Sequence, residues 1–219
     1  MTVEISDRFI VVDIDPANDI EGPGATVALS NGRLMLVGND YTSSSNIHLG
    51  VLDPNSGTLT PRGTVNPTTF GEQDSPAAVQ LANGSVLVAW TDDSATSPDF
   101  YGETVRFRLF NAAGQAQSGE FTAPTSMTGD QDLIQAVALE DGRFALVWED
   151  SGRNERVFQI FNADGSRSGG EHILPHGFGD LTGGSLTTYG TNGLAAVGVV
   201  SVNGGGYALM LQRYTAAGN

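Results

Sequence analysis

Carboxylates recur at matched positions along this chain, and they are the side chains best suited to do chemistry. Glu72, Asp130 and Asp180 form one series, and Asp74 and Asp132 follow the first two at the same spacing. Oxygen ligands of this kind suit hard cations such as Ca²⁺ rather than soft metals. We therefore predict a calcium site on these five residues. The alternative is turn capping, because an Asp before a strand commonly accepts hydrogen bonds from backbone N–H groups.

A second group of loop residues could contact a ligand directly. Aromatic side chains beside carboxylates suit carbohydrate recognition, and the aromatic residues of this group do not recur from one repeat to the next. Asp40, Asp92 and Asp150 do recur, each eight residues after a turn glycine, and this regularity favours a structural bond as the alternative. The predicted ligand-binding residues are Tyr41, Asp92, Asp93, Phe100, Tyr101 and Asp150.

The sequence contains no Ser-His-Asp order, nucleotide fingerprint or phosphate loop. The enzymatic chemistry that it could support is acid–base work by two carboxylates, as in glycoside cleavage. The candidate pair lies among Asp74, Asp130, Asp132 and Asp150. The favoured function is nevertheless a non-enzymatic module that binds a glycan or a protein, with the hydrolase and a structural spacer as alternatives.

A repeated turn sets out the elements that must position these residues. An Asn-Gly or Asp-Gly pair ends at Gly32, Gly84, Gly142 and Gly193, at spacings of 52, 58 and 51 residues. Such a pair between apolar runs predicts a β-hairpin with a type I′ turn, which needs positive φ at both central residues. A fixed spacing of this size is typical of a repeat array or a propeller.

A second hairpin follows each of these turns, so each unit contains four strands, the content of one propeller blade. The sequence therefore predicts an all-β fold, a four-bladed β-propeller of four-stranded antiparallel blades, as one domain over residues 1–219. The last unit lacks a fourth strand, and residues 5–12 are predicted to supply it and to close the ring without an open sheet edge. The units cover about residues 25–65, 77–125, 135–176 and 185–219.

The two ends of the blades differ in charge and in loop length. The hairpin turns are short and carry Arg33, Arg143 and Arg167, whereas the longer loops at the opposite end hold most of the acidic residues, including Glu103. Rigid scaffolds usually carry function on such loops. The first strand of a blade is innermost, so Asp74 and Asp132 are predicted to ring the mouth of the central channel. Trp90 and Trp148 end matched strands, which favours packing between blades over a sugar platform.

The composition restricts the partners. The formal net charge is −15, all ten basic residues are Arg, and such a chain repels nucleic acid and anionic membranes. It favours cations or basic partners, although the acidity could also serve solubility alone. The absence of Cys excludes disulfides and thiol chemistry. No apolar run is long enough to insert in a membrane, no secretory signal is visible, and the sequence sets no oligomeric state.

The third unit and its flanks resemble a repeat of large secreted, adhesin-type proteins of Gram-negative bacteria. The matching residues are Gly129-Asp-Gln131, LEDGRFALVW at 139–148, Phe158-Gln-Ile-Phe-Asn162-Ala-Asp-Gly165 and Gly169-Gly-Glu171. Units two and three match well, unit one fairly and unit four weakly. Such repeats often stand beside calcium-binding repeats-in-toxin segments, which this chain lacks. The resemblance implies a β-propeller-like fold and an extracellular or cell-surface location, and it implies no particular activity.

Overall fold

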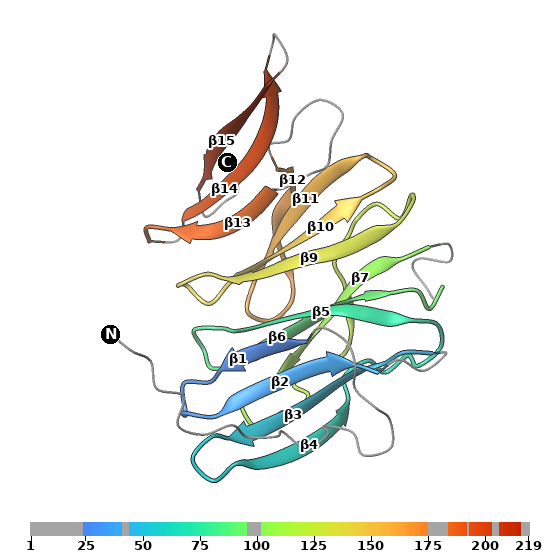
Figure 1. The fold of residues 1–219 in the computed structure, drawn as a ribbon, viewed down its shortest axis with the longest axis vertical. Coiled ribbons are helices and arrows are strands. Elements are labelled where there is room, and N and C mark those ends of the chain that lie inside the picture. Colours follow the sequence, from blue (N-terminus) through green and yellow to red (C-terminus); the bar gives the residue numbers. More distant parts are fainter. Residues whose placement is uncertain are drawn as a thin grey trace.

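The computed structural model describes residues 24–40, 44–95, 102–174, 184–191, 193–202 and 206–215. The regular structure of these residues consists of antiparallel strands in four sheets (Figure 1). Sheet one contains β1 (Ala25–Ala28), β2 (Leu34–Asn39), β3 (Ile47–Asp53) and β4 (Thr58–Thr64), and sheet two contains β5 (Gln73–Gln80), β6 (Val86–Asp92), β7 (Thr104–Phe110) and β8 (Phe121–Thr122). Sheet three contains β9 (Gln131–Ala138), β10 (Phe144–Asp150), β11 (Glu155–Phe161) and β12 (Arg167–Ile173), and sheet four contains β13 (Gly184–Tyr189), β14 (Gly193–Val202) and β15 (Gly206–Tyr214).

The first hairpin of sheets one to three has a longer turn than the sequence predicts. Leu139 N donates to Arg143 O at 2.8 Å, so the turn holds three residues, and of these Gly142 has positive φ (89°) while Asp141 does not. The predicted type I′ turn is therefore wrong. Three-residue hairpins of this kind place one residue, usually Gly, in the left-handed region. The Asp has a different task, because its carboxylate accepts the Arg143 N–H at 3.1 Å.

The strand pairing shifts the fourth unit by one residue against its sequence alignment. Leu194 lies opposite Thr188 as Phe144 lies opposite Ala138, so Leu194 corresponds to Phe144. The position that corresponds to Asp150 is consequently Val200, and not Ser201, the residue that lies eight positions after Gly193. Unit four therefore lacks a polar side chain at this position of the repeat.

Apolar side chains from neighbouring sheets form three cores, one at each junction between consecutive sheets. Trp90 is buried between sheets one and two, and Trp148 with Phe107 is buried between sheets two and three. Both tryptophans are 0% exposed, which confirms the predicted packing role and excludes a sugar-stacking platform. The core between sheets three and four includes Phe158 and Leu194.

The first strands of the sheets, β1, β5, β9 and β13, follow one another, and sheets one and four lie at opposite ends of the long axis (Figure 1). The predicted closing strand, residues 5–12, lies outside the described residues, and closure into a four-bladed ring stays a prediction. Sheet four has three strands in the described part of the chain. No helix among the described residues is long and apolar enough to cross a membrane.

Candidate functional site

A Gly-acid-Gln sequence joins each of two successive sheets to its predecessor. The copies are Gly71-Glu72-Gln73 and Gly129-Asp130-Gln131, and both glutamines are 0% exposed. Gln131 N donates to Glu103 O at 2.9 Å, and Ser151 N donates to Asp130 O at 2.9 Å. The same two bonds occur at the first copy, so the backbone on either side of Glu72 and Asp130 is held in place.

The glycine of this sequence is required for close backbone approach. Gly129 has φ +74°, and a Cβ on it would lie 2.6 Å from the backbone N of Gly152. That contact is too short for any side chain, so the loop that carries Asp130 packs directly on the turn after β10.

Gly152→Ala is expected to destabilise the protein by about 1–3 kcal/mol. The added Cβ would overlap the Thr128 carbonyl oxygen. Neither atom can rotate away, because the oxygen is part of the backbone and the Cβ is fixed to it. Gly170→Ala is the matched control, because a Cβ there meets open space and the residue is not in the left-handed region. Urea unfolding monitored by tryptophan fluorescence measures both, and equal midpoints for the two variants would contradict the packing described.

Four carboxyl groups gather where the loop ends of sheets two and three meet, and we call Asp74, Glu103, Asp130 and Asp132 the acidic cluster. Glu103 directly precedes β7, Asp130 directly precedes β9, Asp132 is in β9 and Asp74 is in β5. The Glu103 N–H donates to Asp130 Oδ1 at 3.3 Å, and the carboxyl of Glu103 hydrogen-bonds that of Asp132. Gly102 permits this approach, because it has φ +99° and a Cβ there would overlap Asp130 Oδ1.

The hydrogen bond to Asp132 is the largest cause that raises the pKa of Glu103, to about 8. Burial and the negative charges of Asp132, Asp74 and Asp130 act in the same direction. A cluster of carboxylates can be relieved by a cation, by arginine or by a proton. The raised pKa of Glu103 therefore favours a proton on the Glu103–Asp132 pair at neutral pH.

This proton makes stability depend on pH. The pKa of Glu103 rises from its ordinary value of 4.5 to about 8 on folding, so the folded state binds the proton more tightly. The contribution to stability is therefore complete below pH 4.5 and is lost as pH rises toward 8. Urea unfolding of the wild type and of Glu103→Gln at pH 5 and pH 8.5 is the measurement. We expect a steeper fall for the wild type, and parallel behaviour would contradict the shared proton.

The comparison with Glu103→Gln at each pH is needed because other groups titrate. Burial lowers the pKa of His172, so its contribution is lost as pH falls, in the opposite direction. Burial also raises the pKa of Glu120, so its contribution to stability is lost as pH rises, as for Glu103. Both groups are unchanged in the variant, and the difference between the two proteins isolates Glu103.

The repeated Asp series lies inside the protein. Asp92 is 2% exposed and contacts Arg106 Nε at 2.5 Å, while Ser94 Oγ donates to it at 2.7 Å. Asp150 is 0% exposed and forms an ion pair with Arg153 at 3.1 Å. These contacts are the structural bonds that the sequence offered as the alternative. We therefore leave Asp92 and Asp150 out of the candidate site.

The remaining predicted residues are divided between exposed positions and undescribed ones. Glu72 and Asp93 are exposed at the same loop end, one directly before β5 and the other directly after β6. Tyr41, Phe100, Tyr101 and Asp180 lie outside the described residues. The predicted calcium set is thus brought together in part, as Asp74, Asp130 and Asp132. Among the residues that the structure describes, no three acidic or histidine side chains are arranged to hold a metal ion.

Glu103 is the member of the cluster that sequence reasoning did not single out. The strand pairing makes it equivalent to Ser45 in unit one, whose backbone O also accepts the N–H of the next unit's Gln73. In both units this residue, one or two positions before the third strand, accepts a backbone hydrogen bond from the Gln of the following Gly-acid-Gln loop. This position in the repeat is the signal that would have identified Glu103.

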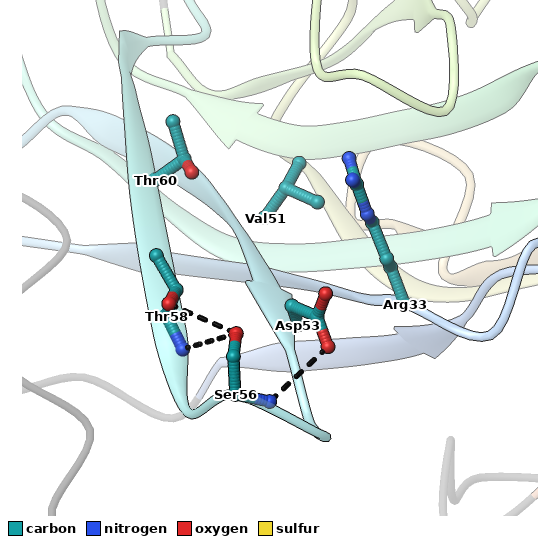
Figure 2. Close-up of a pocket in the computed structure, with 6 residues that line it drawn as sticks. All are labelled: Arg33, Val51, Asp53, Ser56, Thr58 and Thr60. Carbon is teal, nitrogen blue, oxygen red and sulfur yellow. Dashed lines mark hydrogen bonds between the residues drawn. The ribbon is translucent and has the colours of Figure 1, made fainter.

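A small polar cavity lies at the opposite, turn end of sheet one (Figure 2). Its volume is about 210 Å³, less than the roughly 300 Å³ at which ligand pockets usually begin. Ser56 N donates to Asp53 Oδ1 at 3.4 Å and Ser56 Oγ donates to Thr58 Oγ1 at 2.9 Å within its wall. The lining residues are Arg33, Val51, Asp53, Ser56, Thr58 and Thr60, and none belongs to the acidic cluster.

No protein-family model and no curated protein matches this sequence. Solved structures do share its fold. A sialidase, Hadza microbial sialidase Hz136, matches with a TM-score of 0.58 and 14% identity over 87% of this chain and 44% of that one. The α-L-arabinanase of Penicillium chrysogenum matches with a TM-score of 0.55 and 16% identity over 94% of this chain and 65% of that one.

The β-propeller domain of the trilobed protease from Pyrococcus furiosus matches with a TM-score of 0.54 and 8% identity. The match covers 90% of this chain and 54% of the Pyrococcus furiosus chain. At these identities the likeness shows the fold alone, which is all-β and of the β-propeller type. This chain spans less than two thirds of the length of each of the three structures.

Proposed function

We propose that the protein is a carbohydrate-active hydrolase that works at the acidic cluster, with Glu103 as its general acid. The observation that carries this proposal is the place of Glu103, half-buried among three other carboxyl groups that raise its pKa to about 8. A general acid needs a pKa near the working pH, and glycoside cleavage uses one protonated and one ionised carboxyl group. The fold is compatible with this chemistry, since a sialidase and an arabinanase share it. This proposal replaces the non-enzymatic module favoured from the sequence.

In the proposed reaction Glu103 gives its proton to the glycosidic oxygen while the bond from that oxygen to the anomeric carbon breaks. A water molecule attacks the anomeric carbon and releases its proton to a second carboxylate. We propose Asp74 for that role, because it is half-buried at the start of β5. Its negative charge also raises the pKa of Glu103 more than the charge of Asp130 does. Asp132 orients Glu103 through their hydrogen bond.

Residues other than Glu103 and Asp74 are proposed to bind the glycan. Exposed Asp93 and the aromatic residues Tyr41, Phe100 and Tyr101 are the proposed glycan contacts. An extracellular or cell-surface location fits a glycan substrate. Calcium stays a proposal for Asp74, Asp130 and Asp132, where a divalent cation would compete with the proton of Glu103 for the same oxygens.

The test is hydrolysis of a panel of 4-nitrophenyl glycosides and a 4-methylumbelliferyl sialoside between pH 5 and pH 9. Each assay is run with Ca²⁺ and with chelator. We expect turnover of at least one glycoside, with activity falling as pH rises through about 8 because Glu103 then loses its proton. Equal activity with Ca²⁺ and with chelator would remove calcium from the proposal and leave the acid–base pair.

Binding measured on a glycan array provides the complementary result. A glycan that binds without turnover at any pH would contradict the hydrolase and support the binding module predicted from the sequence. Neither binding nor turnover would support a structural spacer. Glu140→Gln serves as the control, since it removes an exposed carboxylate from the turn between β9 and β10, at the opposite end of the sheets.

A further inference from the structure

The outer face of sheet four is apolar and exposed. Val197 is 40% exposed, Leu209 77% and Leu211 59%. In the pairing of β14 with β15, Val197 lies opposite Leu211, whereas Leu194 lies opposite Tyr214 and both of those are buried against sheet three. Side chains alternate between faces, so the exposed residues belong to the face turned away from sheet three. We call them the sheet-four face, with Val197, Tyr207, Leu209 and Leu211 as its members.

The same positions of the other sheets form the junction with the next sheet. The strand pairs that correspond to Val197 and Leu211 pack on the following sheet in every case, and each side chain in them is at most 3% exposed. They are Val37 with Leu49, Ala89 with Phe107, and Val147 with Phe158. The sheet-four face is therefore built as one more junction between sheets.

Sheet one carries the complementary half of such a junction. Leu34 lies opposite Leu52, as Phe144 lies opposite Phe161 in sheet three. Phe144 and Phe161 pack on the preceding sheet, whereas Leu34, Leu36 and Leu52 fall outside the core that sheet one shares with sheet two. We call Leu34 and Leu36, which are half-buried, the sheet-one face, and Leu52 opposite Leu34 is 8% exposed. No preceding sheet covers them in the described part of the chain.

We propose that the sheet-four face of one copy packs on the sheet-one face of a second copy. Within one chain the two faces lie at opposite ends of the long axis (Figure 1), so they meet readily only between copies. The contact continues the series of junctions already present along the chain. It joins different surfaces, so it either closes into a ring of copies or extends as a chain of copies.

The test is light scattering coupled to size exclusion, over a range of protein concentrations in 0.15 M salt. We expect the wild type to show at least twice the chain mass, and Leu209→Ser/Leu211→Ser and Leu34→Ser/Leu36→Ser each to show the mass of one chain. Phe70→Ser is the control, because Phe70 is 73% exposed and belongs to neither face. A 1:1 mixture of the two double variants should form a species of two chains, since each retains one intact face.

A crosslinking experiment covers the case in which a double variant fails to fold. The chain has no Cys, so Leu211→Cys and Leu36→Cys introduce the sole thiols. Mixing the two single variants should give a crosslinked dimer. The proposal would be overturned if the wild type stayed at the mass of one chain and the two cysteine variants gave no crosslinked dimer. An internal crosslink in a chain that carries both thiols would also contradict the proposal, because the two faces would then meet within one chain. So would dimerisation of Leu34→Ser/Leu36→Ser, because that variant could pair only through two sheet-four faces.

Discussion

Glu103→Gln is expected to lower kcat for an unactivated glycoside by about 10²–10⁴-fold, the usual contribution of a general acid. Gln has nearly the shape of Glu and keeps a hydrogen bond to Asp132, but it has no acidic proton to give to the leaving oxygen. The substrate is the unactivated disaccharide with the same sugar as the 4-nitrophenyl glycoside that the wild type turns over fastest. Because Glu103 acts only after substrate is bound, KM should change little.

The leaving group separates acid catalysis from general damage. The leaving group of a 2,4-dinitrophenyl glycoside departs as the phenolate without being protonated. Glu103→Gln should therefore retain most of the wild-type rate on that substrate. The fall of activity through about pH 8 should also disappear in the variant, because it reports the pKa of Glu103. Equal losses on both substrates would contradict the assignment of the acid, and the control Glu140→Gln should be unaffected on either.

Arg106→Ala is expected to destabilise the protein by about 3–5 kcal/mol, because it leaves buried carboxylates without their cation. The Arg106 side chain is 6% exposed and lies between Asp92, at 2.5 Å, and Glu120. It joins the end of β6 to the residue before β8 through β7. The measurement is the midpoint of urea unfolding, with circular dichroism to confirm that the variant retains its sheets.

Arg143→Ala is the matched control. Arg143 pairs with Asp141 at 2.7 Å, but both side chains are partly exposed, and surface pairs contribute at most about 1 kcal/mol. Replacing Arg106 and Asp92 together by apolar residues should cost less than Arg106→Ala alone, since no unpaired Asp92 remains. Equal losses for Arg106→Ala and Arg143→Ala would show that burial does not set the strength of these pairs.

The acidic series illustrate how far repeat positions can be interpreted from sequence. Asp92 and Asp150 occupy matching positions, and the structure gives each of these buried carboxylates an arginine partner. The sequence could not tell this role from ligand binding, because the partner Arg106 comes from another strand. Glu103 was overlooked for the same reason, since its importance depends on Asp132 in the next sheet.

What the sequence determined by itself was local. Turn glycines such as Gly142 and the alternation of apolar residues predict hairpins and strands because both depend on neighbours in the chain. The all-β class, the four units and the packing role of Trp148 follow from this regularity. Only the tertiary structure decided which face Val197 and Leu211 present and that Glu103 meets Asp132. These depend on contacts between sheets, whose partners are distant in sequence and leave no periodic signal.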